Sequence, residues 1–272
     1  QTPMPNKHLE HPEDLILLGT DPNEVLDHLF MVHKLTTKWD GAPSIVFGNN
    51  NGKFFVGTKS VFNKKKIKIN YSVADIVKNH EGAVAQILTA CFYSLPRIEG
   101  IVQADFIGFG GSDSYRPNTI TYKFPSIISQ DVIIAPHTAY NEVSPNAVPI
   151  FGVKLKSTDT CYCIDTETCS LDVPFKAKSL IQAARFLVPF CKFPTTDLRS
   201  YYNKFIREGK TPTASELYYS LDDKYKCEVN INTFRLYNLI LNIKDVLLSA
   251  VKVDETVEYL LGDQPTTPEG YV

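Results

Sequence analysis

The feature that most constrains the fold is a change of pattern near residue 173. Before it, short runs rich in β-branched and aromatic residues alternate with Gly, Pro and Asn turns, which is typical of strands. The clearest expected strands are 34–39, 43–48, 53–62 and 100–109. After it, apolar residues recur at helical spacing, and several runs follow Ser, Thr, Asp or Asn caps. The expected helices are 177–190, 195–209, 213–225, 230–251 and 254–262.

Segregated runs of strands and helices predict an α+β fold, with antiparallel sheets flanked by helices. The turn "NNNG" at 49–52 predicts a hairpin, and Glu81-Gly82 is expected to separate two helices. A further helix is expected to begin near Asp21-Pro22. The closing "EGYV" has the pattern of a strand, so we expect a β-rich core at 1–172, an inserted helical subdomain at 173–263 and a return to the core at 264–272.

The composition argues against a strongly basic nucleic-acid-binding protein, a membrane-spanning protein and a structural zinc protein. The net charge of −2 gives no global basic field, although "NKKKIKIN" (63–70) is a candidate wall for a basic groove. No apolar run approaches the roughly 20 residues of a membrane span, so no membrane partner is expected. The six cysteines in a chain of 272 residues indicate reduced thiols and a cytoplasmic location. "CYCIDTETC" supplies three cysteines, whereas a structural zinc takes about four ligands.

The first segment with chemistry in it is Lys38-Trp39-Asp40-Gly41. A lysine becomes a nucleophile only as the free amine, and its attack leaves a covalent intermediate. A strand end followed by a Gly turn would hold such a side chain at the rim of a pocket. The spacing K-x-D-G arises by chance in about one chain in twenty of this size, so the surrounding residues decide its meaning.

This segment resembles motif I of the covalent nucleotidyltransferases, which include ATP-dependent DNA and RNA ligases and GTP-dependent mRNA capping enzymes. The resemblance implies that Lys38 attacks the α-phosphate of the nucleotide and becomes lysyl-NMP. Thr37, Asp40 and Gly41 would then belong to the nucleotide pocket.

Companion motifs follow in order. Lys59, in "GTKSVFNK", occupies the place of a phosphate-binding arginine, and Asp105, in "IVQADFIGF", matches an acid that binds the ribose or organises the metal. Phe124, in "ITYKFPSI", matches an aromatic that stacks on the purine, with Tyr122 as the alternative. Glu269, in "PEGYV", would bind the divalent ion together with Asp105. An acid in an apolar strand such as this one requires a partner in either a structural or a functional role.

The order and spacing are most similar to the phage-type second class of RNA ligases, and the pattern also resembles uncharacterised tailed-phage proteins. The resemblance implies an adenylation fold, ATP-grasp-like, with ATP and Mg²⁺ or Mn²⁺ as cofactors. It implies a polynucleotide partner, RNA rather than DNA, in a host cytoplasm if phage-encoded. The alternatives are a DNA ligase, a GTP-dependent capping guanylyltransferase and a non-catalytic nucleic-acid-binding relative. The oligomeric state is left open.

Four departures from the family pattern matter. Lys59 replaces an arginine, and Pro43 stands where DNA ligases often have an arginine. The Lys-x-Lys pair expected after Glu269 is absent from this sequence, since "GVKLKS" precedes that residue. No appended OB-fold is recognised, which favours an RNA ligase. His33, His80 and His137 are expected to be surface or hydrogen-bonded histidines, and the G-x-G-G run in "FIGFGGSDSY" (106–115) is expected to be a loop.

Overall fold

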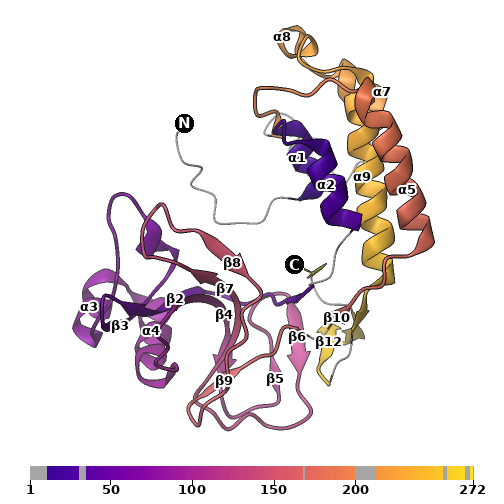
Figure 1. Ribbon diagram of the computed structural model, residues 1–272. Helices are drawn as coiled ribbons and strands as arrows, with labels where there is room; N and C mark the ends of the chain where they lie inside the picture. Colours follow the sequence, from indigo (N-terminus) through magenta and orange to yellow (C-terminus); the bar gives the residue numbers. More distant parts are fainter. Residues whose placement is uncertain are drawn as a thin grey trace. The chain divides into compact units, whose positions relative to one another are not determined.

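The computed structural model describes residues 11–30, 35–167, 169–199, 212–253, 256–266 and 270–271. The chain divides into two compact units (Figure 1). The core unit contains residues 34–169 and 253–272, and the helical unit contains residues 8–33 and 170–252. The α+β class with antiparallel sheets is confirmed. The helical unit differs from the expected 173–263, because it also contains residues 8–33 and because it ends at residue 252.

The core unit is built on a sheet of six strands. Its order is β3-β2-β4-β7-β8, and β9 pairs with β7 in parallel, whereas the other pairs are antiparallel. The strands are β2 (Ser44–Asn50), β3 (Lys53–Gly57), β4 (Ile101–Phe109), β7 (Val132–Tyr140), β8 (Pro149–Phe151) and β9 (Cys161–Cys163). The expected hairpin is confirmed: Asn51 and Gly52 both have positive φ, at 54° and 87°, as a two-residue type I′ turn requires.

Two helices cover one face of this sheet. α3 (Val73–Asn79) starts at the cap Ser72, whose hydroxyl accepts from Asp75 N–H, and α4 (Gly82–Ser94) starts after the expected break. Their apolar side chains pack on those of β2 and β4 in a fully buried core, and each large side chain there contributes about 1.5–3 kcal/mol. The main members of this core are Ile45, Phe47, Ile76, Leu88, Val102 and Phe106.

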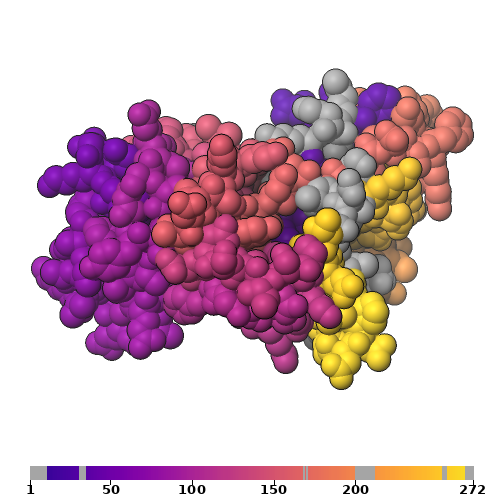
Figure 2. All heavy atoms as spheres, turned by 90° about the horizontal axis from the view of Figure 1, so that it is seen from below, coloured from indigo at the N-terminus to yellow at the C-terminus, as the bar shows by residue number. Residues whose placement is uncertain are grey.

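A second sheet of four strands belongs to the same unit. Its order is β13-β12-β6-β5, formed by β13 (Gln264–Pro265), β12 (Glu258–Leu261), β6 (Ile120–Lys123) and β5 (Ser114–Tyr115). Figure 2 shows the C-terminal residues, in yellow, beside the magenta strands. The helix expected over 254–262 is therefore wrong for its described part. The short run "EYLL" pairs with β6 instead, and Gly262, at φ 63°, turns the chain into β13.

Two short ladders complete the strands. β1 (Thr37–Lys38) pairs with β14 (Gly270–Tyr271), which confirms a strand at the end of the chain. β10 (Cys169–Ser170) pairs with β11 (Lys252–Val253) where the chain leaves the core unit and returns to it. A single 3₁₀ turn, η1 (Lys59–Phe62), follows β3.

The helical unit is organised around one long helix, α9 (Ile231–Ala250), which contacts α1, α5 and α7. Asn230 caps it, in a capping box with Thr233. The expected helix near Asp21 is confirmed as α2, where the Asp21 carboxylate accepts from Asn23 N–H. Most of the helix expected at 195–209 lies outside the described residues. The remaining helices are α1 (Pro12–Leu17), α2 (Pro22–Phe30), α5 (Phe175–Leu187), η2 (Val188–Phe190), α7 (Ala214–Tyr219) and α8 (Asp223–Lys226).

Candidate functional site

The strand that carries Lys38 has only two residues. Thr37 is buried on it, whereas the Lys38 side chain is exposed. Thr37 N–H donates to the carbonyl of Thr166 at 2.8 Å, and the ladder places Lys38 opposite Gly270. Gly270 directly follows Glu269, which lies outside the described residues. The backbone of Lys38 thus pairs with the residue that follows Glu269 in the sequence.

The turn after this strand lies directly on β4. Ala42 N–H donates to the Phe106 carbonyl at 3.1 Å, and Phe106 N–H donates to the Pro43 carbonyl at 3.1 Å. A β-carbon on Gly41 would meet the Phe106 carbonyl oxygen at 2.6 Å and the Asp105 Cβ at 2.8 Å. Only glycine fits such a contact without movement of its neighbours. The turn of the K-x-D-G segment and the acid expected to act with it are therefore in contact.

Asp40 is held from both its backbone and its side chain. Its N–H donates to Tyr122 Oη at 2.7 Å. Its carboxylate accepts from Asn118 Nδ2 at 3.0 Å and from Thr119 Oγ1 at 3.4 Å. Asn118 and Thr119 precede β6, so the second sheet fixes the turn that follows Lys38.

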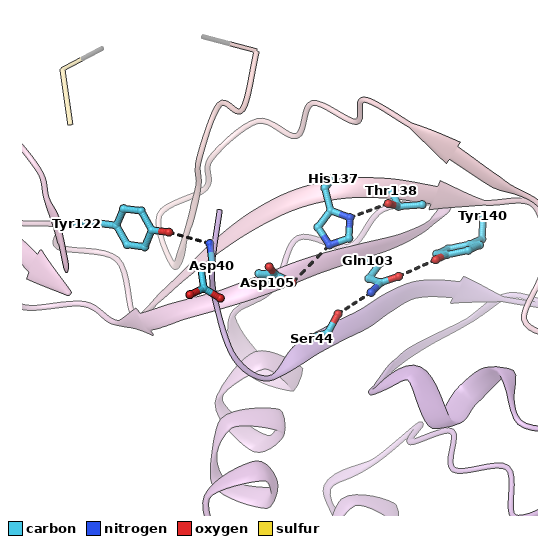
Figure 3. A network of polar contacts seen from close by, with 8 residues as sticks. All are labelled: Asp40, Ser44, Gln103, Asp105, Tyr122, His137, Thr138 and Tyr140. Carbon is cyan, nitrogen blue, oxygen red and sulfur yellow. Dashed lines mark hydrogen bonds and ion pairs between the residues drawn. The ribbon is translucent and has the colours of Figure 1, made fainter. Parts of the chain in front are cut away.

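Asp105 faces a histidine on the neighbouring strand. Its Oδ1 lies 3.4 Å from Nε2 of His137, and the two side chains are 19% and 34% exposed (Figure 3). The other ring nitrogen, Nδ1, lies 2.6 Å from Thr138 Oγ1. The partner that an acid in this apolar strand requires is thus an imidazole.

A buried polar chain continues along the same face of the sheet. Tyr140 Oη donates to Gln103 Oε1 at 2.6 Å, and Gln103 Nε2 donates to Ser44 Oγ at 2.6 Å (Figure 3). Gln103 is 5% exposed, so both of its polar atoms must be satisfied inside the protein. Burial raises the pKa of Tyr140 to about 12, which keeps its hydroxyl protonated as a donor.

The two aromatic candidates for base stacking belong to a buried cluster. Tyr122 and Phe124 are 0% and 4% exposed, and their ring centroids lie 4.4 Å and 6.1 Å from that of Trp39. In this conformation they pack beneath the turn and present no open face to a base. Trp39 Nε1 and Thr166 Oγ1, also buried, have no hydrogen-bond partner among the described residues.

Lys59 is exposed at the first position of η1, where Thr58 caps the turn by accepting from Ser60 N–H. Three exposed lysines, residues 64–66, follow the same turn. These four cations form an exposed basic segment next to β3, which is suited to phosphate groups.

The described residues contain no group of three or more His, Cys, Asp or Glu side chains able to hold a metal ion. Mg²⁺ does not need such a cage, because it is held by one or two carboxylates and completes its shell with substrate phosphates and water. Asp105 supplies one accessible carboxylate, and Glu269 is the second expected ligand. No described helix meets the length and apolarity that a membrane crossing demands.

Sequence reasoning missed the polar groups around Asp105, namely Ser44, Gln103, His137 and Thr138. The sequence predicted only that His137 is a surface or hydrogen-bonded histidine, because no local motif marks this residue. Only the pairing of β4 with β7 brings it to Asp105.

Comparison with curated proteins gives no match, and comparison with solved structures gives none either. The model of DUF6267, a family of unknown function, matches residues 6–272, and the chain therefore belongs to DUF6267.

Proposed function

We propose that this protein is a covalent nucleotidyltransferase with an adenylation fold, and that it works as an ATP-dependent polynucleotide ligase. The observation that carries the proposal is the contact between Gly41 and Asp105. Two motifs far apart in the sequence meet there, at the end of the strand that carries Lys38. The pairing of Lys38 with Gly270 supports it, because Gly270 directly follows Glu269 in the sequence.

The proposed reaction has three in-line steps. The Lys38 amine attacks the α-phosphorus of ATP, a P–N bond forms, the bond to the β-phosphate oxygen breaks and pyrophosphate leaves. A terminal 5′-phosphate oxygen of the polynucleotide then displaces the lysine and takes the adenylyl group. A 3′-hydroxyl finally attacks that 5′-phosphate and expels AMP. Mg²⁺, when bound, offsets the charge that develops on phosphate oxygens.

Residues of the core unit would divide these tasks. Lys38 is the catalytic nucleophile, and Lys59 is an exposed cation for phosphates. Asp40 keeps the turn in place through Tyr122, Asn118 and Thr119 rather than by contact with substrate. Asp105 is proposed to bind the ribose or to organise the metal site, and Glu269 is proposed to bind the divalent ion.

The proposed acceptor is RNA, bound through sequence-independent contacts between the basic segment and phosphates. A cytoplasmic location goes with this proposal. A second candidate, a non-catalytic nucleic-acid-binding relative, is favoured by one observation. The rings of Tyr122 and Phe124 are buried and present no open face to a purine.

The experiment is incubation of the protein with α-³²P-ATP and Mg²⁺, followed by denaturing electrophoresis. Wild type is expected to retain acid-labile, alkali-stable label, as a phosphoramidate does. Lys38→Ala is expected to retain none. Lys78→Ala is the matched control, because Lys78 is an exposed lysine on α3, the helix on the opposite face of the sheet. An unlabelled wild type, or equal labelling of Lys38→Ala, would refute the proposal.

The acceptor and the nucleotide are tested separately. GTP in place of ATP distinguishes a capping reaction, and nicked RNA, nicked DNA and triphosphate-ended RNA distinguish the acceptors. Sealing of nicked RNA with ATP is the expected result. Transfer to the triphosphate end with GTP would replace the ligase by a capping guanylyltransferase. Binding of RNA without any labelling would favour the non-catalytic relative.

A further inference from the structure

The geometry points to His137 as a positioning residue that holds Asp105 for a ribose hydroxyl of the bound nucleotide. This inference rests on the proposed function. It adds a residue that lies outside all the sequence motifs that resemble the nucleotidyltransferases.

An irregularity in the strand pairing brings His137 to this place. Gln103 pairs with Thr138 and Ala104 pairs with Pro136, so His137 is an extra residue on β7 with no partner on β4. Side chains on a regular strand alternate between the two faces of a sheet, which would send His137 and Thr138 to opposite sides. The bulge breaks this alternation, and the two consecutive side chains bond to each other (Figure 3).

Both ring nitrogens of His137 are engaged. When the Thr138 hydroxyl donates to Nδ1 across 2.6 Å, the neutral ring carries its proton on Nε2. Nε2 is the nitrogen that faces Asp105 Oδ1 at 3.4 Å. Thr138 is 2% exposed and so is itself fixed by the sheet. The hydroxyl, the imidazole and the carboxylate thus form a line that ends at the accessible side chain.

The remaining capacity of Asp105 indicates what it binds. A carboxylate accepts about four hydrogen bonds, and among the described residues only His137 contacts this one. The donors of ATP are the adenine amino group and the two ribose hydroxyls, whereas its phosphates only accept and would be repelled by a carboxylate. The ribose hydroxyls are donors on every ribonucleotide. His137 would hold Oδ1, leaving Oδ2 for a ribose hydroxyl.

The test is calorimetric titration of the full chain with ATP and with 2′-deoxy-ATP, in the absence of divalent ions so that no transfer occurs. We expect wild type to bind ATP about tenfold more tightly than 2′-deoxy-ATP. In His137→Ala this ratio is expected to approach one. His137→Gln should restore most of it, since the side-chain amide supplies a donor in place of Nε2. Thr138→Val, which removes the hydroxyl but keeps the volume, should lower the ratio to an intermediate value.

A double variant shows whether His137 acts through Asp105. If it does, Asp105→Ala and Asp105→Ala/His137→Ala will have the same ratio. His28→Ala is the matched control, because His28 is an exposed histidine on α2 of the helical unit and should leave the ratio unchanged.

Labelling of the same wild-type preparation with α-³²P-ATP and Mg²⁺ separates the two proposals. Labelled wild type with an unchanged ratio in His137→Ala overturns the role of His137 alone. A ratio that depends on His137 without any labelling overturns the nucleotidyltransferase alone. Absence of nucleotide binding at millimolar ATP overturns both.

Discussion

Gly41 and Asp105 are in contact so close that a methyl group on residue 41 would lie 2.8 Å from the Asp105 Cβ. The lack of space for a β-carbon is sufficient to explain why this turn carries a glycine, and no unusual φ angle is needed. It also makes the position of the Asp105 backbone depend on the turn after Lys38, and this dependence leads to the first prediction.

Gly41→Ala should destabilise the core unit by about 1–3 kcal/mol, the usual cost of forcing extra volume into a packed site. Urea unfolding followed by circular dichroism measures the change. Gly100→Ala is the matched control, because a β-carbon at Gly100 meets no atom within 4 Å. A cost for Gly41→Ala no larger than for Gly100→Ala would contradict the close contact.

Tyr122→Phe removes the acceptor of the Asp40 N–H while leaving the ring in its cluster. We expect a loss of about 1 kcal/mol in the free energy of unfolding, since a partly buried donor is left without its partner. Labelling with ATP should slow as the turn loosens. Tyr93→Phe is the control, because Tyr93 is 68% exposed. Unfolding curves that overlay for wild type and both variants would argue against this bond.

Asn118→Ala tests the side-chain support of Asp40. Asn118 is exposed, so the free energy of unfolding should change by less than about 0.5 kcal/mol. The rate of lysine labelling should nevertheless fall about tenfold, because small displacements of a reacting group are costly. Asn146→Ala, in another exposed loop, should alter neither quantity. A large loss of stability with normal labelling would reverse this assignment.

Stability should fall at alkaline pH in a way that depends on Tyr140. Burial raises the pKa of Tyr140 from 10.0 to about 12, so the folded state disfavours the phenolate relative to the unfolded state. The stabilisation is complete below about pH 10 and is lost as the pH rises toward about 12, by up to about 1.4 kcal/mol for each pH unit. Tyr140→Phe should be less stable at neutral pH, because Gln103 loses its donor.

The same variant should lose less stability between pH 10 and 12 than wild type does. Urea unfolding at stepped pH values measures both slopes. Tyr219→Phe, at a position 70% exposed, should keep the wild-type slope. Equal slopes for Tyr140→Phe and wild type would show that other groups cause the alkaline loss.

Local turn and cap chemistry made much of the fold predictable. Asn51-Gly52 predicted a hairpin because few other residues adopt positive φ twice in succession, and Gly82 predicted the break between α3 and α4. The run "EYLL" was wrongly predicted as part of a helix, because its three apolar or aromatic residues suit a helix and a strand equally. Its partner, β6, lies far upstream, so pairing rather than local preference decided the outcome.

The candidate site shows the same contrast between local sequence signals and the pairing of distant strands. Lys38, Asp40 and Gly41 were proposed because one short segment carries them, and Asp105 because its strand resembles a motif of the nucleotidyltransferases. His137 could not be found in this way, since it reaches Asp105 only through a bulge in the pairing of β4 with β7. Such an irregularity depends on how two distant strands align, which neither strand encodes alone.

The buried indole next to Lys38 has a spectroscopic consequence. Trp39 is the single tryptophan of the chain, it is 6% exposed, and its ring centroid lies 4.4 Å from that of Tyr122. Its emission on selective excitation therefore comes from the core unit alone and originates one residue from the candidate nucleophile. Unfolding followed by this emission and by far-ultraviolet ellipticity, to which α9 contributes strongly, would report the two units as separate signals. Divergent midpoints would identify them as independent thermodynamic domains.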